Sequence, residues 1–246
     1  MNATATGDVA IAFDPRLDPG LVGRVYRQSG RVHIGGILSP AAAARIHRAL
    51  VAETPWSYAV GDETGSRDLP VASLDELPPG ERAAVLESTD RAATRGFAYR
   101  YANFRIDEAW DDGRHRDHFL MRVLAFLNSP AFLEFARRVT GVAQIAFADA
   151  QATLYRPGDF LTTHDDAVEG KNRHAAYVLN LTPEWRVDWG GLLAFPDPYG
   201  HVGEAFAPAF NALNLMRVPT PHTVTQVASF AGAGRYSITG WLRSRS

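Results

Sequence analysis

The stretch YRPGDFLTTHDD (residues 155–166) contains two short runs of strand-forming residues around a turn, and it ends in His164-Asp165-Asp166. The turn Arg156-Pro157-Gly158-Asp159 combines the residues that favour chain reversal. Comparable runs fill the rest of the C-terminal part, at residues 145–155, 160–164, 174–181, 191–195, 212–216, 223–228 and 236–242. Several short strands separated by turns are typical of a β-sandwich or jelly roll.

The sequence before Gly141 predicts mainly helices. Ser39-Pro40 and Ser129-Pro130 each place an N-cap residue before a proline at the first helical position. The helices expected are residues 40–52, 81–93, 115–127 and 130–140, with a strand at residues 31–38 and a mobile polar loop at residues 62–68. The fold class expected is therefore α+β: a double-stranded β-helix (jelly-roll) core in about residues 143–246, supported by helices in about residues 1–142, within a single domain spanning residues 1–246.

Composition excludes some classes of function. The net charge is −2 with the two signs interspersed, so no basic stripe is available and nucleic acid is not expected as a partner. The chain has no cysteine, which removes disulfides, thiolate metal sites and cysteine nucleophiles. Any bound metal must be held by His, Asp or Glu.

Targeting signals are not expected. Residues 1–8 are small and polar, without the basic start and apolar run of a signal peptide. No stretch approaches the roughly 20 apolar residues that a membrane span requires. We therefore expect a cytoplasmic protein without a membrane partner.

Two His-x-Asp pairs could contribute to a metal site, His115/Asp117 and His164/Asp166. Such pairs arise easily by chance, but the expected secondary structure separates these two. Residues two apart point to different sides of a helix, which is the structure expected around His115. They share a face on a strand, which is the structure expected before His164. The second pair is therefore the better candidate.

A third ligand is needed, and His222 at the start of a later β run is the best candidate. Two imidazoles and one carboxylate on a β-roll would give the facial triad of non-haem iron(II) oxygenases. A single histidine at a strand start is, however, more often a surface or hydrogen-bonded core residue. Spacing alone leaves this choice open.

Arg235 is the one charged residue in an otherwise uncharged expected strand, Arg235-Tyr236-Ser237-Ile238-Thr239-Gly240-Trp241. A buried guanidinium needs a partner, because an unpaired buried charge is very costly. A dicarboxylate cosubstrate could supply one, since arginine binds carboxylates through two parallel hydrogen bonds. The alternative is an arginine on an edge strand in solvent.

Taken in order, the motifs resemble those of a known family, the prolyl-4-hydroxylase-like branch of the iron(II)/2-oxoglutarate-dependent oxygenases. The similarity covers about residues 143–242, and residues 31–50 resemble the N-terminal strand and helix of that branch. The motifs are Tyr155-x-x-Gly158-Asp159, His164-x-Asp166, Trp185-x-x-x-Trp189-Gly190-Gly191-x-Leu193, Pro221-His222-x-Val224-x-x-Val227 and Arg235-x-Ser237-Ile238-x-Gly240-Trp241.

The resemblance implies roles for individual residues. His164, Asp166 and His222 match the iron ligands, and Arg235 matches the residue that binds the distal carboxylate of 2-oxoglutarate. Four further residues are assigned to the cosubstrate pocket: Tyr155, Asn180, Tyr177 and Ser237. Many relatives carry a tyrosine where this chain has Asn180, with Tyr177 three residues earlier, so the second contact to the carboxylate stays open.

The activity implied is that of a dioxygenase using Fe²⁺, 2-oxoglutarate and O2, with ascorbate as a further cofactor, to hydroxylate a C–H bond and form succinate and CO2. A prolyl residue in a protein or peptide and an amino-acid-like small molecule are both implied as substrates. Neither the substrate nor the oligomeric state follows from these motifs.

Two other classes remain open from the sequence. One is a catalytically silent jelly-roll binding module, and the other is a cupin-like metal enzyme that does not use 2-oxoglutarate. Arg235 argues against the second, because such a site has no need of a dicarboxylate-binding residue. Kinase and serine hydrolase functions are excluded, since His115-Arg116-Asp117 lacks a glycine-rich loop and no G-x-S-x-G motif occurs.

Overall fold

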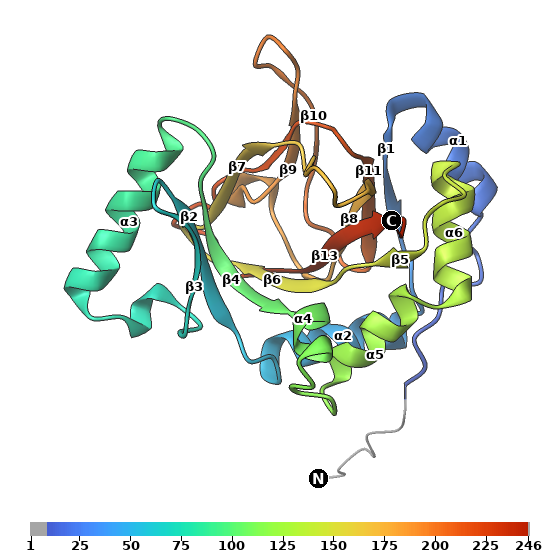
Figure 1. Ribbon diagram of the computed structural model, residues 1–246, viewed down its shortest axis with the longest axis horizontal. Helices are drawn as coiled ribbons and strands as arrows, with labels where there is room; N and C mark the ends of the chain where they lie inside the picture. Colours follow the sequence, from blue (N-terminus) through green and yellow to red (C-terminus); the bar gives the residue numbers. More distant parts are fainter. Residues whose placement is uncertain (1–8, 246) are drawn as a thin grey trace.

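The computed structural model describes residues 9–245. Residues 1–8, on which the expectation about a signal peptide depends, lie outside the described residues. Within these described residues, thirteen strands form one antiparallel sheet that curls into a nearly closed barrel (Figure 1). They are β1 (Arg31–Gly35), β2 (Ser57–Asp62), β3 (Gly65–Leu69), β4 (Tyr99–Arg105), β5 (Phe147–Ala148), β6 (Gln151–Tyr155), β7 (Phe160–His164), β8 (Arg173–Asn180), β9 (Leu193–Pro196), β10 (Val202–Phe206), β11 (Ala212–Arg217), β12 (His222–Val224) and β13 (Arg235–Arg243).

The strand order differs from the chain order, as it does in a jelly roll. It runs β1-β11-β8-β13-β6-β4-β7-β12-β9-β10, with β2 and β3 attached beside β4 and β5 paired with β13. The edge strands β1 and β10 are joined by side chains: Arg31 forms an ion pair with Glu204 and lies 4.4 Å from the ring of Phe195. The expected jelly-roll fold is thus confirmed.

The stretch around residues 155–166 is one interrupted strand. β6 and β7 both run antiparallel to β4, with Leu154 opposite Ala102 and Phe160 opposite Arg100. Residues 156–159 bulge out between the two halves. The carbonyl of Gly158 accepts a hydrogen bond from Nε of the buried Arg100 at 3.0 Å, so the side chain satisfies a group that the ladder leaves unpaired.

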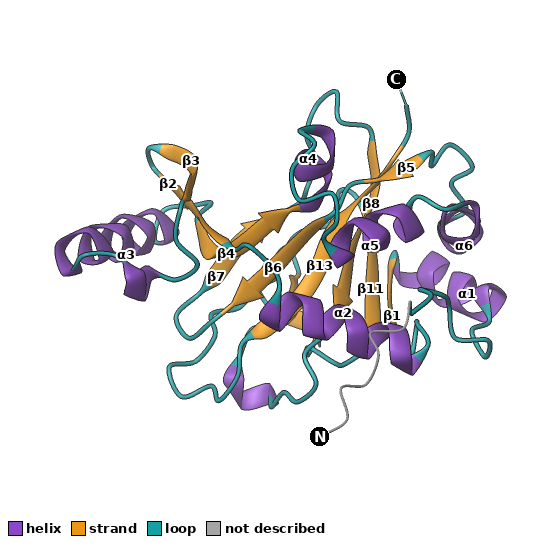
Figure 2. Ribbon diagram, turned by 90° about the horizontal axis from the view of Figure 1, so that it is seen from below, coloured by secondary structure: helices purple, strands orange, loops and turns teal. Residues whose placement is uncertain are grey.

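Six α-helices lie within the described residues: α1 (Pro19–Ser29), α2 (Pro40–Ala52), α3 (Pro79–Ala93), α4 (Ile106–Asp111), α5 (Phe119–Leu127) and α6 (Pro130–Thr140). The hydroxyls of Ser39 and Ser129 cap α2 and α6 as expected, and Gly141 ends α6 in the left-handed conformation at φ 76°. α1, α2, α5 and α6 cover one face of the strands β1, β11, β8 and β13 (Figure 2). Their buried side chains and those of the strands form the main core.

Some expectations from the sequence were wrong. Residues 62–68 are not a loop but most of the β2–β3 hairpin, whose polar side chains conceal the strand pattern. The helix expected from residue 115 begins at Phe119, because His115 adopts a positive φ of 53° and His118 caps the helix by accepting from Leu120 N. The first half of the chain also supplies β4 to the middle of the barrel.

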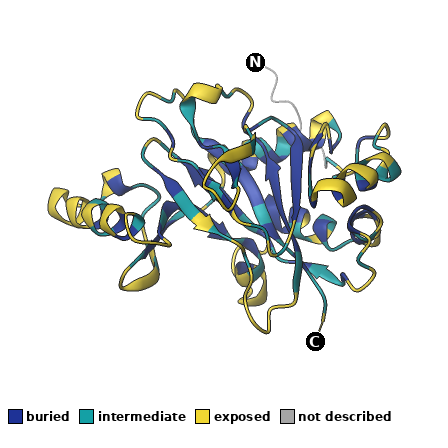
Figure 3. Cartoon of the chain, turned by 90° about the horizontal axis from the view of Figure 1, so that it is seen from above, coloured by how far each residue is buried: buried dark blue, intermediate teal, exposed yellow. Residues whose placement is uncertain are grey.

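α3 packs separately from the other helices, beside β2 and β4 (Figure 1). Most of its surface is exposed, whereas the strands of the barrel are largely buried (Figure 3).

In the described part of the chain, no single helix has the length and apolarity to cross a membrane. The bent pair α5 and α6 meets that test only when taken together.

Candidate functional site

The three residues expected to hold a metal lie together inside the barrel. His164 ends β7, Asp166 follows two residues later, and His222 begins β12 directly opposite His164 in the ladder. One ligand atom from each side chain lies within 4.8 Å of the other two. The three side chains could therefore hold one ion.

Both imidazoles are oriented by backbone carbonyls. Nδ1 of His164 lies 3.0 Å from the oxygen of Thr162, and Nδ1 of His222 lies 2.8 Å from the oxygen of Thr220. A carbonyl oxygen can only accept, so Nδ1 of each ring carries a proton, and in the neutral ring Nε2 then keeps its lone pair. Both Nε2 atoms face the carboxylate of Asp166 at 3.4 Å, one on each oxygen.

The electrostatics favour the forms that bind metals. Burial lowers the pKa of His222, and the nearby His164 lowers it further. Burial alone would raise the pKa of Asp166, but hydrogen bonding to His164 and the charge of His222 lower it overall. Neutral imidazoles and an ionised carboxylate are the states in which these groups coordinate metals. Two imidazoles and one carboxylate, in a chain without cysteine, fit non-haem iron(II).

Arg235 begins β13 and is buried, with 1% of its surface exposed. Its side chain forms no ion pair or hydrogen bond with the described residues, and its Nε is a buried atom without a partner. Its guanidinium lies 5.1 Å from the ring centroid of Tyr155. Burial lowers the pKa of Arg235. An unpaired guanidinium in this position calls for an anionic ligand, since burial without one is costly.

Three of the other expected cosubstrate residues share the inner face of the barrel with Arg235. In the ladder, Tyr155 lies opposite Arg235, and Ser237 lies opposite Asn180. Ser237 Oγ is 2.7 Å from Thr153 Oγ1, and Oδ1 of Asn180 is buried without a partner. Tyr155, Asn180 and Ser237 are therefore brought together around the guanidinium.

Tyr177 is not brought to this group. It lies opposite Gly240, so its side chain points to the helix-covered face of the sheet. There its hydroxyl donates to the carbonyl of Asp149 at 2.6 Å, and its ring contacts Phe132 of α6 with a centroid distance of 6.3 Å. Tyr177 thus lies on the other face of the sheet from Arg235, where it also lines part of the large cavity.

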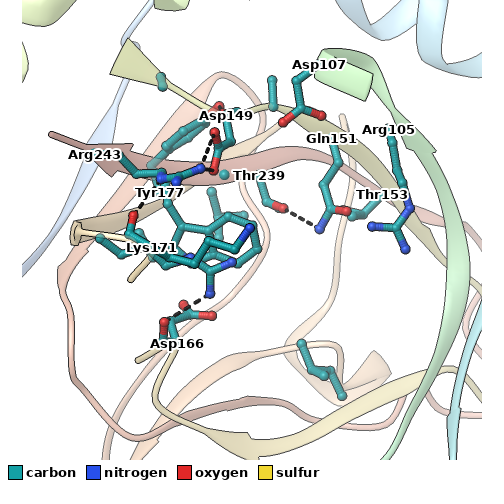
Figure 4. A pocket seen from close by; sticks show the side chains of 18 of the residues that line it. Arg105, Asp107, Asp149, Gln151, Thr153, Asp166, Lys171, Tyr177, Thr239 and Arg243 are labelled. Carbon is teal, nitrogen blue, oxygen red and sulfur yellow. Dashed lines mark hydrogen bonds and ion pairs between the residues drawn. The ribbon is translucent and has the colours of Figure 1, made fainter. Parts of the chain in front are cut away.

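A cavity of about 1270 Å³ contains both the His164, Asp166 and His222 cluster and the guanidinium of Arg235. Figure 4 shows charged and polar residues that line this cavity. Among them, Arg243 forms an ion pair with Asp149 at 3.2 Å, and Gln151 donates to Thr239 at 3.4 Å. The cavity thus joins a potential metal site to a potential anion site.

Sequence reasoning missed an aromatic row on the chain around β4. The centroids of Phe97 and Tyr99 lie 5.5 Å apart, as do those of Tyr99 and Tyr101, and Tyr101 stacks on Tyr155 at 4.8 Å. Phe97 is 55% exposed and lies 5.5 Å from the ring of His164. The alternation Phe97-x-Tyr99-x-Tyr101 is a strand signal that could have found this row.

The rejected His115/Asp117 pair does not join the site. His115 contacts Phe104, with ring centroids 5.6 Å apart, and neither residue belongs to a potential metal cluster among the described residues. The pair was correctly set aside, although it lies in a turn and not in the expected helix.

Comparison with known proteins agrees with this geometry. Residues 150–243 match the family model of the 2OG-Fe(II) oxygenase superfamily, which confirms the resemblance noted from the motifs. Among curated relatives, Prolyl 3-hydroxylase OGFOD1 from Mus musculus is 30% identical over 54% of this chain and 25% of its own length. The Xenopus laevis protein of the same name is 29% identical over 55% and 27%, respectively. The chain thus spans about a quarter of the length of these relatives.

Among solved structures, the chain is similar to a prolyl hydroxylase from Trichoplax adhaerens in complex with a peptide fragment of the hypoxia inducible factor oxygen degradation domain. The TM-score is 0.60 at 18% identity, over 92% of this chain and 89% of that chain. This likeness concerns the fold and supports the jelly-roll architecture.

Proposed function

We propose that residues 150–243, which match the family model of the 2OG-Fe(II) oxygenase superfamily, form an oxygenase domain of the prolyl-hydroxylase-like type. On this premise the protein hydroxylates a C–H bond with iron(II), 2-oxoglutarate and dioxygen. In this proposal His164, Asp166 and His222 hold the iron. Arg235 binds the carboxylate of 2-oxoglutarate that lies away from the metal.

The observation that carries the proposal is the unpaired guanidinium of Arg235 in the same cavity as the three potential metal ligands. A dicarboxylate would neutralise this buried charge at one end and would leave its other carboxylate free to reach the metal. A cupin-like enzyme that does not use 2-oxoglutarate would have no reason to maintain such a costly residue.

Bound iron(II) and 2-oxoglutarate would supply the redox chemistry, in which 2-oxoglutarate, O2 and a C–H bond become succinate, CO2 and an alcohol. The chain's own residues prepare the site. The carbonyls of Thr162 and Thr220 fix the Nε2 atoms of the two histidines toward the metal position. The ring of Tyr155 covers the guanidinium of Arg235 and keeps water from it.

A prolyl residue in a protein or peptide is the substrate that we propose first. The names of the curated relatives and the peptide in the Trichoplax adhaerens structure support this choice. The cavity of about 1270 Å³ also exceeds the range of roughly 300–1,000 Å³ typical of small-molecule pockets, so space remains for a bulky substrate beside the cosubstrate.

The test is succinate formation by the purified protein with iron(II), 2-oxoglutarate and ascorbate, which would keep the iron reduced. Proline-containing peptides are added in one arm, and the same peptides with alanine in place of proline form the matched arm. His222→Ala serves as the inactive control, because two remaining ligands should not retain iron. We expect succinate that depends on iron and His222 and that rises with the proline peptides.

Other outcomes would discriminate the alternatives. Succinate that forms equally with both peptide sets would support the oxygenase and reject the prolyl substrate. Absence of succinate together with absence of 2-oxoglutarate binding, measured by calorimetry with Mn²⁺ in place of iron, would reject the oxygenase. The binding-module alternative would then be favoured.

A further inference from the structure

The guanidinium of Arg173 lies between the indole of Trp241 and the backbone of Asp166. Its central carbon is 3.6 Å from the centroid of the Trp241 ring, a stacked arrangement. Its Nη1 donates to the carbonyl oxygen of Asp166 at 3.0 Å. Asp166 is labelled in Figure 4. All three residues line the cavity that holds the potential metal site.

Asp166 needs such support more than the two histidines do. His164 and His222 belong to paired strands. Asp166 lies in the connection between β7 and β8, where residues 167–172 are all exposed. Asp166 also has a φ of 64°, in the left-handed region that residues other than glycine seldom adopt. A conformation of this kind persists only where its surroundings hold it in place.

The bond from Arg173 acts on the group that this conformation determines. The backbone of Asp166 in this conformation places the Cβ from which its carboxylate reaches between the two Nε2 atoms, each 3.4 Å away. A donor fixed on the carbonyl of Asp166 restrains that backbone and so helps to hold the carboxylate in place. Arg173 is at the first position of β8, and the stacking on Trp241 of β13 holds its plane.

We infer that Arg173, held on Trp241, is a positioning residue that fixes Asp166 as a metal ligand. The inference rests on the proposed function, because it assumes that the His164, Asp166 and His222 cluster binds a metal. It requires the planar guanidinium and not only a positive charge. A lysine ammonium can neither stack as a plane nor donate from a rigid fork, so Arg173→Lys should lose the effect while keeping the charge.

The experiment measures Co²⁺ binding by the apoprotein, without cosubstrate or substrate, from the visible absorption of the bound ion. Arg173→Lys should weaken Co²⁺ binding by about 10- to 100-fold, the usual effect of removing a group that orients a metal ligand. Trp241→Leu should weaken it in the same direction, and Trp241→Phe, which keeps a ring, should weaken it less. The double variant Arg173→Lys/Trp241→Leu should weaken Co²⁺ binding by less than the product of the two single effects, since both changes disrupt the same contact between Arg173 and Trp241.

Arg105→Lys is the matched control. Arg105 also lines the cavity, but its guanidinium is paired with Asp68 at 3.0 Å and not with a residue of the metal cluster. This variant should bind Co²⁺ as the wild type does. Thermal unfolding of every variant identifies any loss of Co²⁺ binding that comes from failure to fold. Arg173→Gln provides a second substitution at the same position, without a charge.

The outcomes separate the inference from the proposed function. Wild-type Co²⁺ affinity and absorption in both Arg173→Lys and Arg173→Gln would overturn the inference. Trp241→Leu with wild-type affinity would overturn the part assigned to Trp241. The proposed function fails instead if the wild type does not bind Co²⁺, or if His222→Ala binds Co²⁺ as the wild type does.

Discussion

Arg235 lies with its guanidinium carbon 5.1 Å from the ring centroid of Tyr155, directly opposite it in the β6–β13 ladder, and both side chains are buried. The tyrosine supplies an aromatic face but no negative charge. The cation is thus held in place without being neutralised. Arg235 therefore has the features of an anion-binding residue and not those of a structural ion pair.

Arg235→Met should separate ligand binding from folding. The variant removes an uncompensated buried charge, so we expect the ligand-free protein to be at least as stable as the wild type. We also expect it to lose the stabilisation that 2-oxoglutarate gives the wild type, about 2.7 kcal/mol at 100 times the dissociation constant. Thermal unfolding with and without 2-oxoglutarate, in the presence of Mn²⁺, measures both. An unchanged 2-oxoglutarate effect would remove Arg235 from the cosubstrate site.

Tyr177→Phe tests the position of a residue that the sequence assigned to the cosubstrate. The change leaves the buried carbonyl of Asp149 without its donor, which should cost about 1–3 kcal/mol of stability. The dissociation constant of 2-oxoglutarate should stay within about twofold of the wild-type value, because the hydroxyl is on the other face of the sheet. Urea unfolding and calorimetry provide the two numbers. A tenfold loss of affinity at unchanged stability would contradict the structural assignment.

Asp159→Asn should change the pH dependence of stability. Burial raises the pKa of Asp159 from 3.8 to about 7. Between these values the folded protein binds a proton that the unfolded chain has lost, so stability falls as pH rises, by about 1.4 kcal/mol per unit. The asparagine variant lacks this slope. The free energy of unfolding of the wild type minus that of the variant, measured with urea, should therefore decrease steadily from pH 4.5 to pH 6.5 as the wild type loses stability.

The control for that experiment is Asp111→Asn, which removes an acid from the exposed surface. A difference between wild type and Asp159→Asn that stays constant over the same pH range would refute the raised pKa. Such a result would mean that the hydrogen bonds from Tyr58 Oη and Arg156 N keep the buried carboxylate ionised.

Gly190→Ala should be strongly destabilising, whereas Gly203→Ala should be nearly neutral. A Cβ at Gly190 would lie 2.1 Å from the carbonyl oxygen of Gln226, and the backbone there has a φ of 63°. A Cβ at Gly203 would meet no atom within 4 Å. We expect a loss above about 2 kcal/mol for the first change, by denaturant unfolding, since backbone strain and a steric clash combine. Equal stability of the two variants would contradict the close approach of Gly190 to the segment around Gln226.

Local signals in the sequence were sufficient for several features. The Ser-Pro caps of α2 and α6 depend on neighbouring residues alone, as does the αL end at Gly141. The turn-separated runs after Gly141 indicated a β-roll, and each run lies in or beside an observed strand. The spacing of His164 and Asp166 predicted a shared face of one strand. The structure brings the two together with His222, but Asp166 lies after the end of β7 with a positive φ, so strand alternation is not the reason.

The β2–β3 hairpin and the start of α5 could not be obtained in this way. Polar strands such as β3 lack the hydrophobic alternation by which strands are recognised, because no residue of β3 is buried, in contrast to its partner β2. At residue 115 the helical pattern continues backward from α5, but a positive φ at His115 interrupts it. Such local geometry depends on contacts with distant residues.

The sequence by itself indicated which residues could carry the proposed chemistry: two histidines on strands, an aspartate just after one of them, and the arginine that begins β13. It also required that Tyr177 and Asn180, three residues apart on one strand, point to opposite faces. Only the tertiary structure decided which of them faces Arg235, because the answer depends on the register that sets Asn180 opposite Ser237. The stacking of Arg173 on Trp241 was likewise decided by the pairing of β8 with β13, since strand order is fixed by the packing of the whole sheet and not by any one segment.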